Sequence, residues 1–177
     1  PTNRSGTIQG SLTVTDSSDA MVKELFTLEI NTRRYEVTWE TKELEYSWDE
    51  YLDQGQQWEG SITPGEDGRV TAFIGVLELQ QDLVAPQDNF TLSIFIVEDN
   101  YDKSAQTGGG NITSNESTSA SLSAENMNPN GEDGIYDSDS EEALLQQLLT
   151  ASGTRSGQGT WIWSVTAQQA DPDPLFE

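Results

Sequence analysis

Apolar and polar residues alternate along most of the chain, and this period of two predicts β-strands. Ile8, Leu12 and Val14 fall on one face of a first strand, and Phe26 and Leu28 on one face of a second. The same period recurs at Tyr35, Val37, Trp39, Leu44, Tyr46, Trp48, Phe90, Leu92, Ile94, Ile96, Trp161, Trp163 and Val165. Because neighbouring side chains of a strand point to opposite faces, the pattern is typical of half-buried sheets. We expect an all-β fold, a single jelly roll or other β-sandwich of about eight antiparallel strands.

Two stretches depart from simple alternation. Residues 69–79 form a nearly continuous apolar run, which is typical of a strand buried on both faces. Residues 160–167 form a strong closing strand rich in Trp, Ile and Val. We expect this closing strand to pair with the first one, because such pairing closes a sandwich or barrel and removes an exposed edge.

Residues 100–158 are rich in Gly, Ser, Asn and Thr, and we expect a long loop or insert there within one β-barrel domain over residues 1–177. Gly108–Gly110 marks a turn or hinge, and Ala120 and Leu122 allow one or two weak strands. One short helix is expected at 139–152. Ser138 and Glu141 fit a capping box at its start, and Gly153 fits the position after its end.

The expected helix carries a narrow apolar stripe. Two interpretations stay open for it, packing within the domain and contact with a neighbouring subunit. A second small apolar group ends the chain. The candidate subunit contacts are therefore Leu144, Leu145, Leu148, Leu149, Leu175 and Phe176.

The net charge is the strongest indication of the protein's environment. The chain has 31 acidic and 8 basic residues, a net charge of −23. Such a surface repels itself at ordinary ionic strength, but at about 1 M salt the screening length falls to about 3 Å. The acidic residues are scattered over the expected strands, which favours a folded surface adapted to high salt. An ordinary acidic extracellular domain is the alternative, and neither would bind nucleic acid through a basic face.

The chain has no Cys and no His. It therefore has no disulfide, no thiolate chemistry, no Ser-His-Asp arrangement and no histidine metal ligand. Trp–acid neighbours at 39–40, 48–50 and 58–59 resemble parts of sugar-binding or two-carboxylate glycosidase sites. Adjacent strand residues face opposite sides, however, so an inward Trp beside an outward Glu is expected of any half-buried sheet. We expect a protein that is not an enzyme.

Residues 126–137 place oxygen-bearing side chains at the spacing of an EF-hand calcium loop. The candidate ligands are Asn126, Asn128, Asn130 and Asp137. The first position is Asn instead of Asp, the last is Asp instead of Glu, and no helix is expected before the loop. A structural calcium or sodium ion is one interpretation and a turn rich in Asn and Gly is the other. No other cofactor is expected.

The start of the chain favours a protein made in the cytoplasm without a signal peptide. It has no long apolar segment for a membrane span, and Pro1 suits a trimmed initiator Met better than a signal-peptidase site. Four possible glycosylation sites, Asn3, Asn89, Asn111 and Asn115, point instead to a cell surface.

The strand pattern over residues 7–97 and 159–168, the acidity, Pro1 and the Trp-rich closing strand together resemble one viral family. This is the smaller major capsid protein of icosahedral haloarchaeal viruses with an internal membrane. The resemblance implies a single upright jelly roll in the virion capsid. It also implies contacts with copies of itself, with a second capsid protein and, through other proteins, with the membrane.

Two other classes stay open. Tail-tube and capsid decoration proteins of tailed haloarchaeal viruses are β-sandwiches with one helix, and their opening strand resembles residues 5–11. A cell-surface adhesion or carbohydrate-binding β-sandwich is the third possibility.

Overall fold

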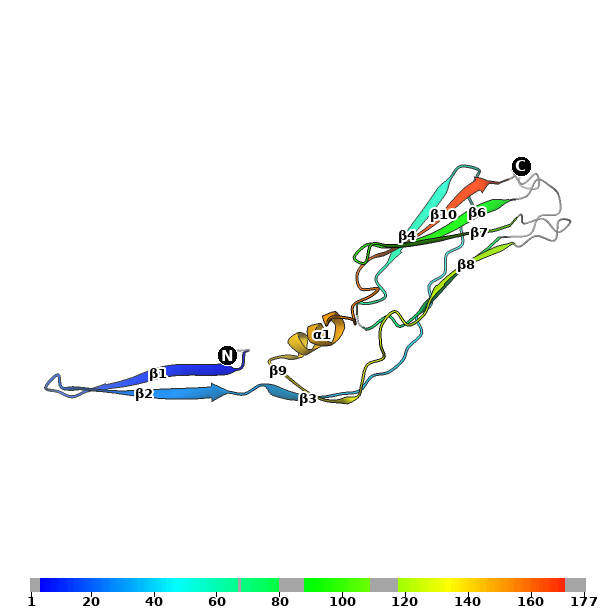
Figure 1. The fold of residues 1–177 in the computed structure, drawn as a ribbon. Helices are drawn as coiled ribbons and strands as arrows, with labels where there is room; N and C mark the ends of the chain where they lie inside the picture. Colours follow the sequence, from blue (N-terminus) through cyan, green and yellow to red (C-terminus); the bar gives the residue numbers. More distant parts are fainter. Residues whose placement is uncertain (1–3, 67, 80–87, 109–117, 171–177) are drawn as a thin grey trace. The chain divides into compact units, whose positions relative to one another are not determined.

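The computed structural model describes residues 4–66, 68–79, 88–108 and 118–170 (Figure 1). These residues form antiparallel strands and one short helix, which confirms the expected β-rich fold. The chain groups into two compact units, residues 1–40 with 132–151 (unit 1) and residues 41–131 with 152–177 (unit 2). This grouping is finer than the one domain expected over residues 1–177, and each unit is described by itself. The jelly-roll topology stays a prediction.

Unit 1 begins with a long hairpin, which we call the arm (residues 6–30). Strands β1 (Gly6–Thr15) and β2 (Met21–Ile30) pair along their whole length, from Gly6 opposite Ile30 to Thr15 opposite Met21. Asp16 shapes the turn between them, because its carboxylate accepts the backbone N–H groups of Ser18 and Ala20 at 2.7 and 3.0 Å. Asx side chains close turns in this way, so the register of the arm is set at its tip.

The rest of unit 1 is a small sheet and the helix. Strand β3 (Arg33–Val37) pairs with β9 (Gly134–Ser138), and α1 (Glu141–Thr150) follows directly. The expected cap at Ser138 is wrong, because Ser140 caps the helix and its Oγ accepts the N–H of Ala143 at 3.1 Å. Ser138 is instead buried at the end of β9.

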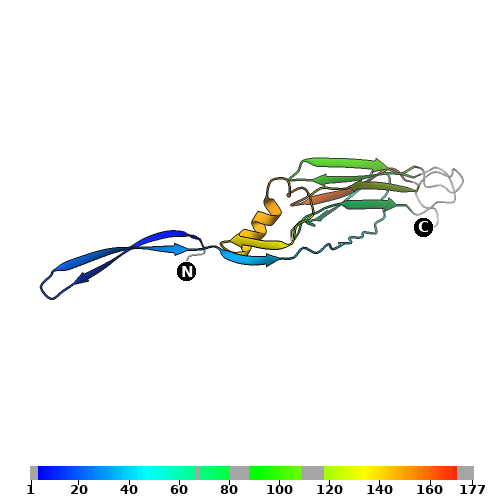
Figure 2. The ribbon, with the colours of Figure 1, turned by 60° about the horizontal axis from the view of Figure 1, so that its bottom comes forward.

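Unit 2 is a sandwich of two antiparallel sheets (Figure 2). The larger has the order β4 (Gln57–Ile62), β10 (Trp161–Gln169), β6 (Asn89–Ile96) and β7 (Tyr101–Gln106). The smaller pairs β5 (Phe73–Glu78) with β8 (Ser119–Ala124). Both sheets contribute to one core, whose buried residues are Leu92, Ile94, Ile96, Ala120, Leu122, Trp161 and Trp163.

Aromatic rings join the two sheets of unit 2. Phe73 on β5 meets Trp161 and Trp163 on β10 edge-to-face, at centroid distances of 5.1 and 5.8 Å. Aromatic pairs favour this arrangement because the edge of one ring is positive and the face of the other is negative. Gly75 lets the Trp163 ring approach β5, since a Cβ there would overlap the ring. The alternation of residues 161–165 thus places its Trp side chains inward, as the sequence predicts.

The closing strand does not pair with the first one, so that expectation is wrong. Both edges of β10 are occupied within unit 2, by β4 and by β6, whereas β1 pairs with β2. Two physical reasons apply. The chain closes a hairpin from β1 to β2 over a short turn at little entropic cost. The Trp side chains of β10, in contrast, belong in the core between the sheets of unit 2, where Phe73 of β5 packs against both rings.

Three other stretches differ from expectation. The alternation at Leu44, Tyr46 and Trp48 forms no strand, although Trp48 packs against Trp58 of β4 with ring centroids 5.1 Å apart. Residues 100–158 were expected mostly as loop but contain β7, β8 and β9. Strand β5, expected to be buried on both faces, leaves Ile74 and Val76 exposed.

Candidate assembly surfaces

The arm has two chemically different faces, because residues opposite one another on paired antiparallel strands share a face. The apolar face consists of Gly6, Ile8, Gly10, Leu12, Val14, Val22, Glu24, Phe26, Leu28 and Ile30. The other face, which we call the polar face, consists of Thr7, Gln9, Ser11, Thr13, Thr15, Met21, Lys23, Leu25, Thr27 and Glu29. The hairpin is therefore amphipathic in the way a half-buried sheet is, with a single charged residue, Glu24, on its apolar face.

Within unit 1, no described residue covers this apolar face. Leu12 and Val22 are 61% and 62% exposed, and Val14 and Leu28 are exposed to a similar degree. A two-stranded hairpin alone is marginally stable in water, and it needs further strands or a packed face to persist. The arm therefore has the chemistry of an element that packs against another surface.

The arm together with its flanking residues, over 4–34, differs from the rest of the chain in charge. Residues 4–34 contain four basic and four acidic residues, so their net charge is zero. The remainder holds the other 27 acidic and 4 basic residues and thus carries the whole −23. The cancelling residues are Arg4, Lys23, Arg33, Arg34, Asp16, Asp19, Glu24 and Glu29. Residues 4–34 as a whole therefore meet less like-charge repulsion at an acidic surface than the rest of the chain, while the arm itself has four acidic residues and one basic residue, a net charge of −3.

Hydrogen bonds fix the base of the arm within unit 1. The backbone N–H of Ser5 donates to Oδ1 of Asp139 at 2.8 Å. Hydrogen bonds from the Ser5 side chain and backbone lower the pKa of Asp139, because they stabilise its ionised form. Arg34 and Asp137, opposite one another on β3 and β9, form an ion pair at 3.7 Å. Both side chains are exposed, so this pair adds at most about 1 kcal/mol.

A second apolar surface lies on unit 2, on the outer face of β5 and β8. Ile74 and Val76 of β5 are 78% and 57% exposed, and they lie opposite Ser123 and Ser121 of β8. We call Ile74, Val76, Glu78, Ser119, Ser121 and Ser123 the β5–β8 outer face. Its two branched side chains beside a row of small residues form a short apolar ridge.

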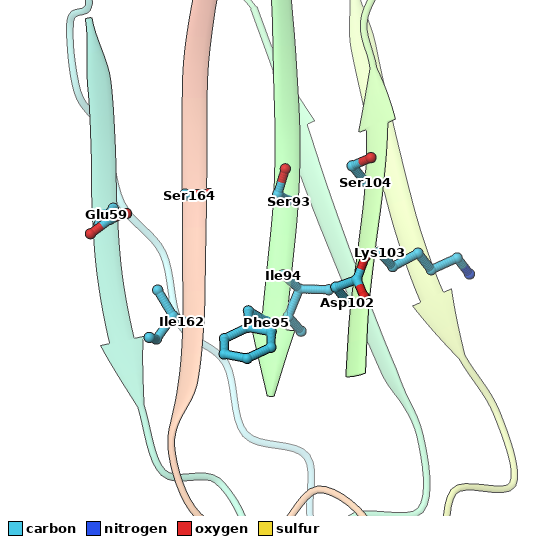
Figure 3. A pocket seen from close by; sticks show the side chains of 9 residues that line it. All are labelled: Glu59, Ser93, Ile94, Phe95, Asp102, Lys103, Ser104, Ile162 and Ser164. Carbon is cyan, nitrogen blue, oxygen red and sulfur yellow. The ribbon is translucent and has the colours of Figure 1, made fainter. Parts of the chain in front are cut away.

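A shallow groove lies on the outer face of the larger sheet (Figure 3). It holds two carboxylates, Glu59 on β4 and Asp102 on β7, at opposite edges of the sheet. Three strand spacings separate them, roughly 14 Å. Paired glycosidase carboxylates lie no more than about 9.5 Å apart. This groove therefore lacks the geometry of a two-carboxylate site.

The Trp residues that precede acidic residues in the sequence differ in burial. Trp58 of β4 is half-buried toward the core and Glu59 is exposed on the other face, as strand geometry predicts. Trp48, Asp49 and Glu50 are all exposed.

The four residues proposed as cation ligands are divided between the units, with Asp137 in unit 1 and the three Asn residues in unit 2. Asn128 is buried, and its amide holds loops together: it donates to the carbonyls of Val70 (2.8 Å) and Ser156 (2.6 Å) and accepts the N–H of Ser156 (3.0 Å). Asn126 and Asn130 are exposed. The described part of the chain contains no cluster of three acidic residues suited to a metal, and the ion site stays a prediction.

The residues proposed as subunit contacts differ in burial. Leu144 and Leu149 are buried, Leu148 is half-buried, and Leu145 is 49% exposed. Leu175 and Phe176 lie outside the described residues. Sequence reasoning missed the arm as a candidate surface, although the alternation at Ile8, Leu12 and Val14 carried the signal.

Comparisons with protein-family models, with curated proteins and with solved structures give no match. Within the described ranges, no helix is long and apolar enough to cross a membrane. The functional argument therefore depends on the chain's own surfaces.

Proposed function

We propose that this chain is a structural virion protein, a capsid subunit of a halophilic archaeal virus that acts by assembly and catalyses no reaction. The observation that carries the proposal is the arm, whose apolar face has no cover among the described residues of unit 1. In this proposal copies of the same chain, together with a second capsid protein, supply the cover. The location is the virion, after synthesis in the host cytoplasm.

The charge distribution supports assembly in brine. Copies that carry −23 each repel one another strongly in dilute solution. High salt screens this repulsion over a few ångströms. The apolar face of the arm, whose single charged residue is Glu24, then supplies a contact with little like-charge repulsion. Association through the arm is therefore favoured in the solvent of a halophilic host.

A tail-tube or capsid decoration protein is the second candidate. The sandwich of unit 2 and the single helix among the described residues fit the general description of those proteins. The long opening hairpin also begins at the residues that resemble their first strand. Both candidates share the central property, repeated self-association through surfaces of a rigid β-domain.

Electron microscopy of the purified protein in salt above about 1 M tests the proposal. Closed shells support a capsid subunit, and tubes support the second candidate. A protein that stays monomeric under these conditions contradicts both, and would favour a cell-surface module.

A pair of matched variants links assembly to the arm. Leu12→Asp places a charge on the apolar face, and Thr13→Asp places the same charge one residue along, on the polar face. We expect Leu12→Asp to abolish assembly and Thr13→Asp to retain it. Equal behaviour of the two variants would exclude the apolar face as the contact.

A further inference from the structure

Strand β5 has the apolar composition of a strand buried on both faces, but only one of its faces is buried. Its sequence, Phe-Ile-Gly-Val-Leu-Glu, is apolar on both faces, as in strands enclosed by two layers. Phe73 and Leu77 pack against the core, whereas Ile74 and Val76 are mostly exposed. Strand β5 also pairs on one edge alone among the described residues, with β8. Within the described residues of unit 2, no layer therefore covers the β5–β8 outer face.

The apolar face of the arm suits this surface in side-chain size and in strand length. The outer face presents Ser119, Ser121 and Ser123 beside its two branched residues, which leaves room for large side chains. The arm presents Phe26 and Leu28, which are large and exposed. Ten-residue strands extend for about 33 Å and six-residue strands for about 20 Å, so the arm can cover the whole length of β5.

Charge permits this pairing. Each of the two faces holds a single charged residue, Glu24 on the arm and Glu78 on the β5–β8 outer face. Because the arm is longer than β5, it can be seated with these carboxylates apart. Packing the apolar face of one arm on that of another would bury both faces, but it would leave Ile74 and Val76 exposed.

We propose that the apolar face of the arm of one copy packs on the β5–β8 outer face of a second copy. This inference rests on the proposed self-association and names its two surfaces. Each copy then has one donor surface and one acceptor surface, so the contact is heterologous and repeats from copy to copy. Such contacts produce closed rings or extended arrays, which a shell or a tube requires.

A mixing experiment tests the pairing without depending on its register. Leu12→Asp disables the donor surface, and Val76→Asp disables the acceptor surface. Each variant alone should be monomeric in sedimentation velocity at molar salt, where the unmodified chain forms particles. An equimolar mixture should give a one-to-one dimer, because it retains one intact arm and one intact outer face.

Two controls keep the result interpretable. Thr166→Asp, on the outer face of the larger sheet, should assemble as the unmodified chain does. Circular dichroism and Trp fluorescence verify that Val76→Asp is folded, and Ile74→Ser replaces it if it is not.

The outcomes separate this inference from the proposed function. If Val76→Asp and Ile74→Ser assemble normally while Leu12→Asp does not, the arm has another acceptor and the inference is overturned, with the proposed function intact. A mixture that stays monomeric also overturns the inference. If Leu12→Asp and Val76→Asp both assemble as the unmodified chain does, or if that chain never assembles, the inference and the arm-based function fail together.

Discussion

The phenyl ring of Phe26 lies over Gly10 of the paired strand, in the space that a side chain at residue 10 would occupy. Any Cβ at Gly10 would overlap the ring. The absent side chain therefore lets the Phe26 ring, the largest side chain of the arm, occupy the space beside Gly10 on the paired strand. This places one continuous apolar surface on the arm instead of two separate rows.

The first prediction concerns this pair. Gly10→Val should displace the Phe26 ring and weaken association by about 1 kcal/mol, or about fivefold, at the low end of overpacking costs because the ring is half-exposed. Sedimentation equilibrium in molar salt measures the change. Ser11→Val adds a comparable side chain on the polar face and should leave association unchanged. Equal association constants for Gly10→Val and the unmodified chain would show that the ring position is irrelevant to assembly.

The second prediction concerns Asn128, whose amide is hydrogen-bonded to Val70 and Ser156. Asn128→Ala leaves these backbone groups without partners and should lower the free energy of unfolding by about 2–3 kcal/mol. Denaturant unfolding at constant salt measures the loss. Asn130→Ala, at an exposed position, should change stability by less than about 0.5 kcal/mol. A calcium-dependent rise in Tm that both variants abolish would instead assign the two side chains to an ion.

The third prediction concerns pH and the base of the arm. Hydrogen bonds from Ser5 lower the pKa of Asp139 below its usual value of 3.8, because they favour the carboxylate. The stabilisation is therefore fully present above pH 3.8 and is lost as pH falls through the lower folded pKa. An NMR titration of the Asp139 carboxyl carbon should have its midpoint below 3.8, and Ser5→Ala should shift it upward. A midpoint at or above 3.8 in the unmodified chain would exclude the hydrogen bonds.

Much of the strand content can be predicted from the sequence, because alternation reports which side chains share a face. It identifies β1, β2, β6 and β10, and the Leu spacing with Gly153 identifies α1. Alternation does not report which strands are neighbours, and so it misplaces the partner of β10. It also arises without backbone pairing at Tyr46 and Trp48, where one-sided packing on Trp58 is sufficient.

The assembly surfaces could be predicted only in part. An apolar face looks the same in sequence whether its own chain or another copy covers it. The alternation at Ile8 and Leu12 and the continuous run through Ile74 and Val76 both predict burial, yet the structure leaves both sets exposed. Strand β7 was missed because its polar sequence, with Lys103 and Asp102, is that of an edge strand without a periodic apolar face.

The central claim is that highly acidic copies associate through the apolar face of the arm when salt screens their charge. Sedimentation velocity from molar salt down to about 0.01 M, where the screening length reaches about 30 Å, tests it most directly. Circular dichroism at each step verifies the fold. We predict large particles in molar salt that dissociate to monomers in dilute buffer and reform when salt is restored. Particles that stay intact in dilute buffer, or a monomer at every salt concentration, would contradict the account.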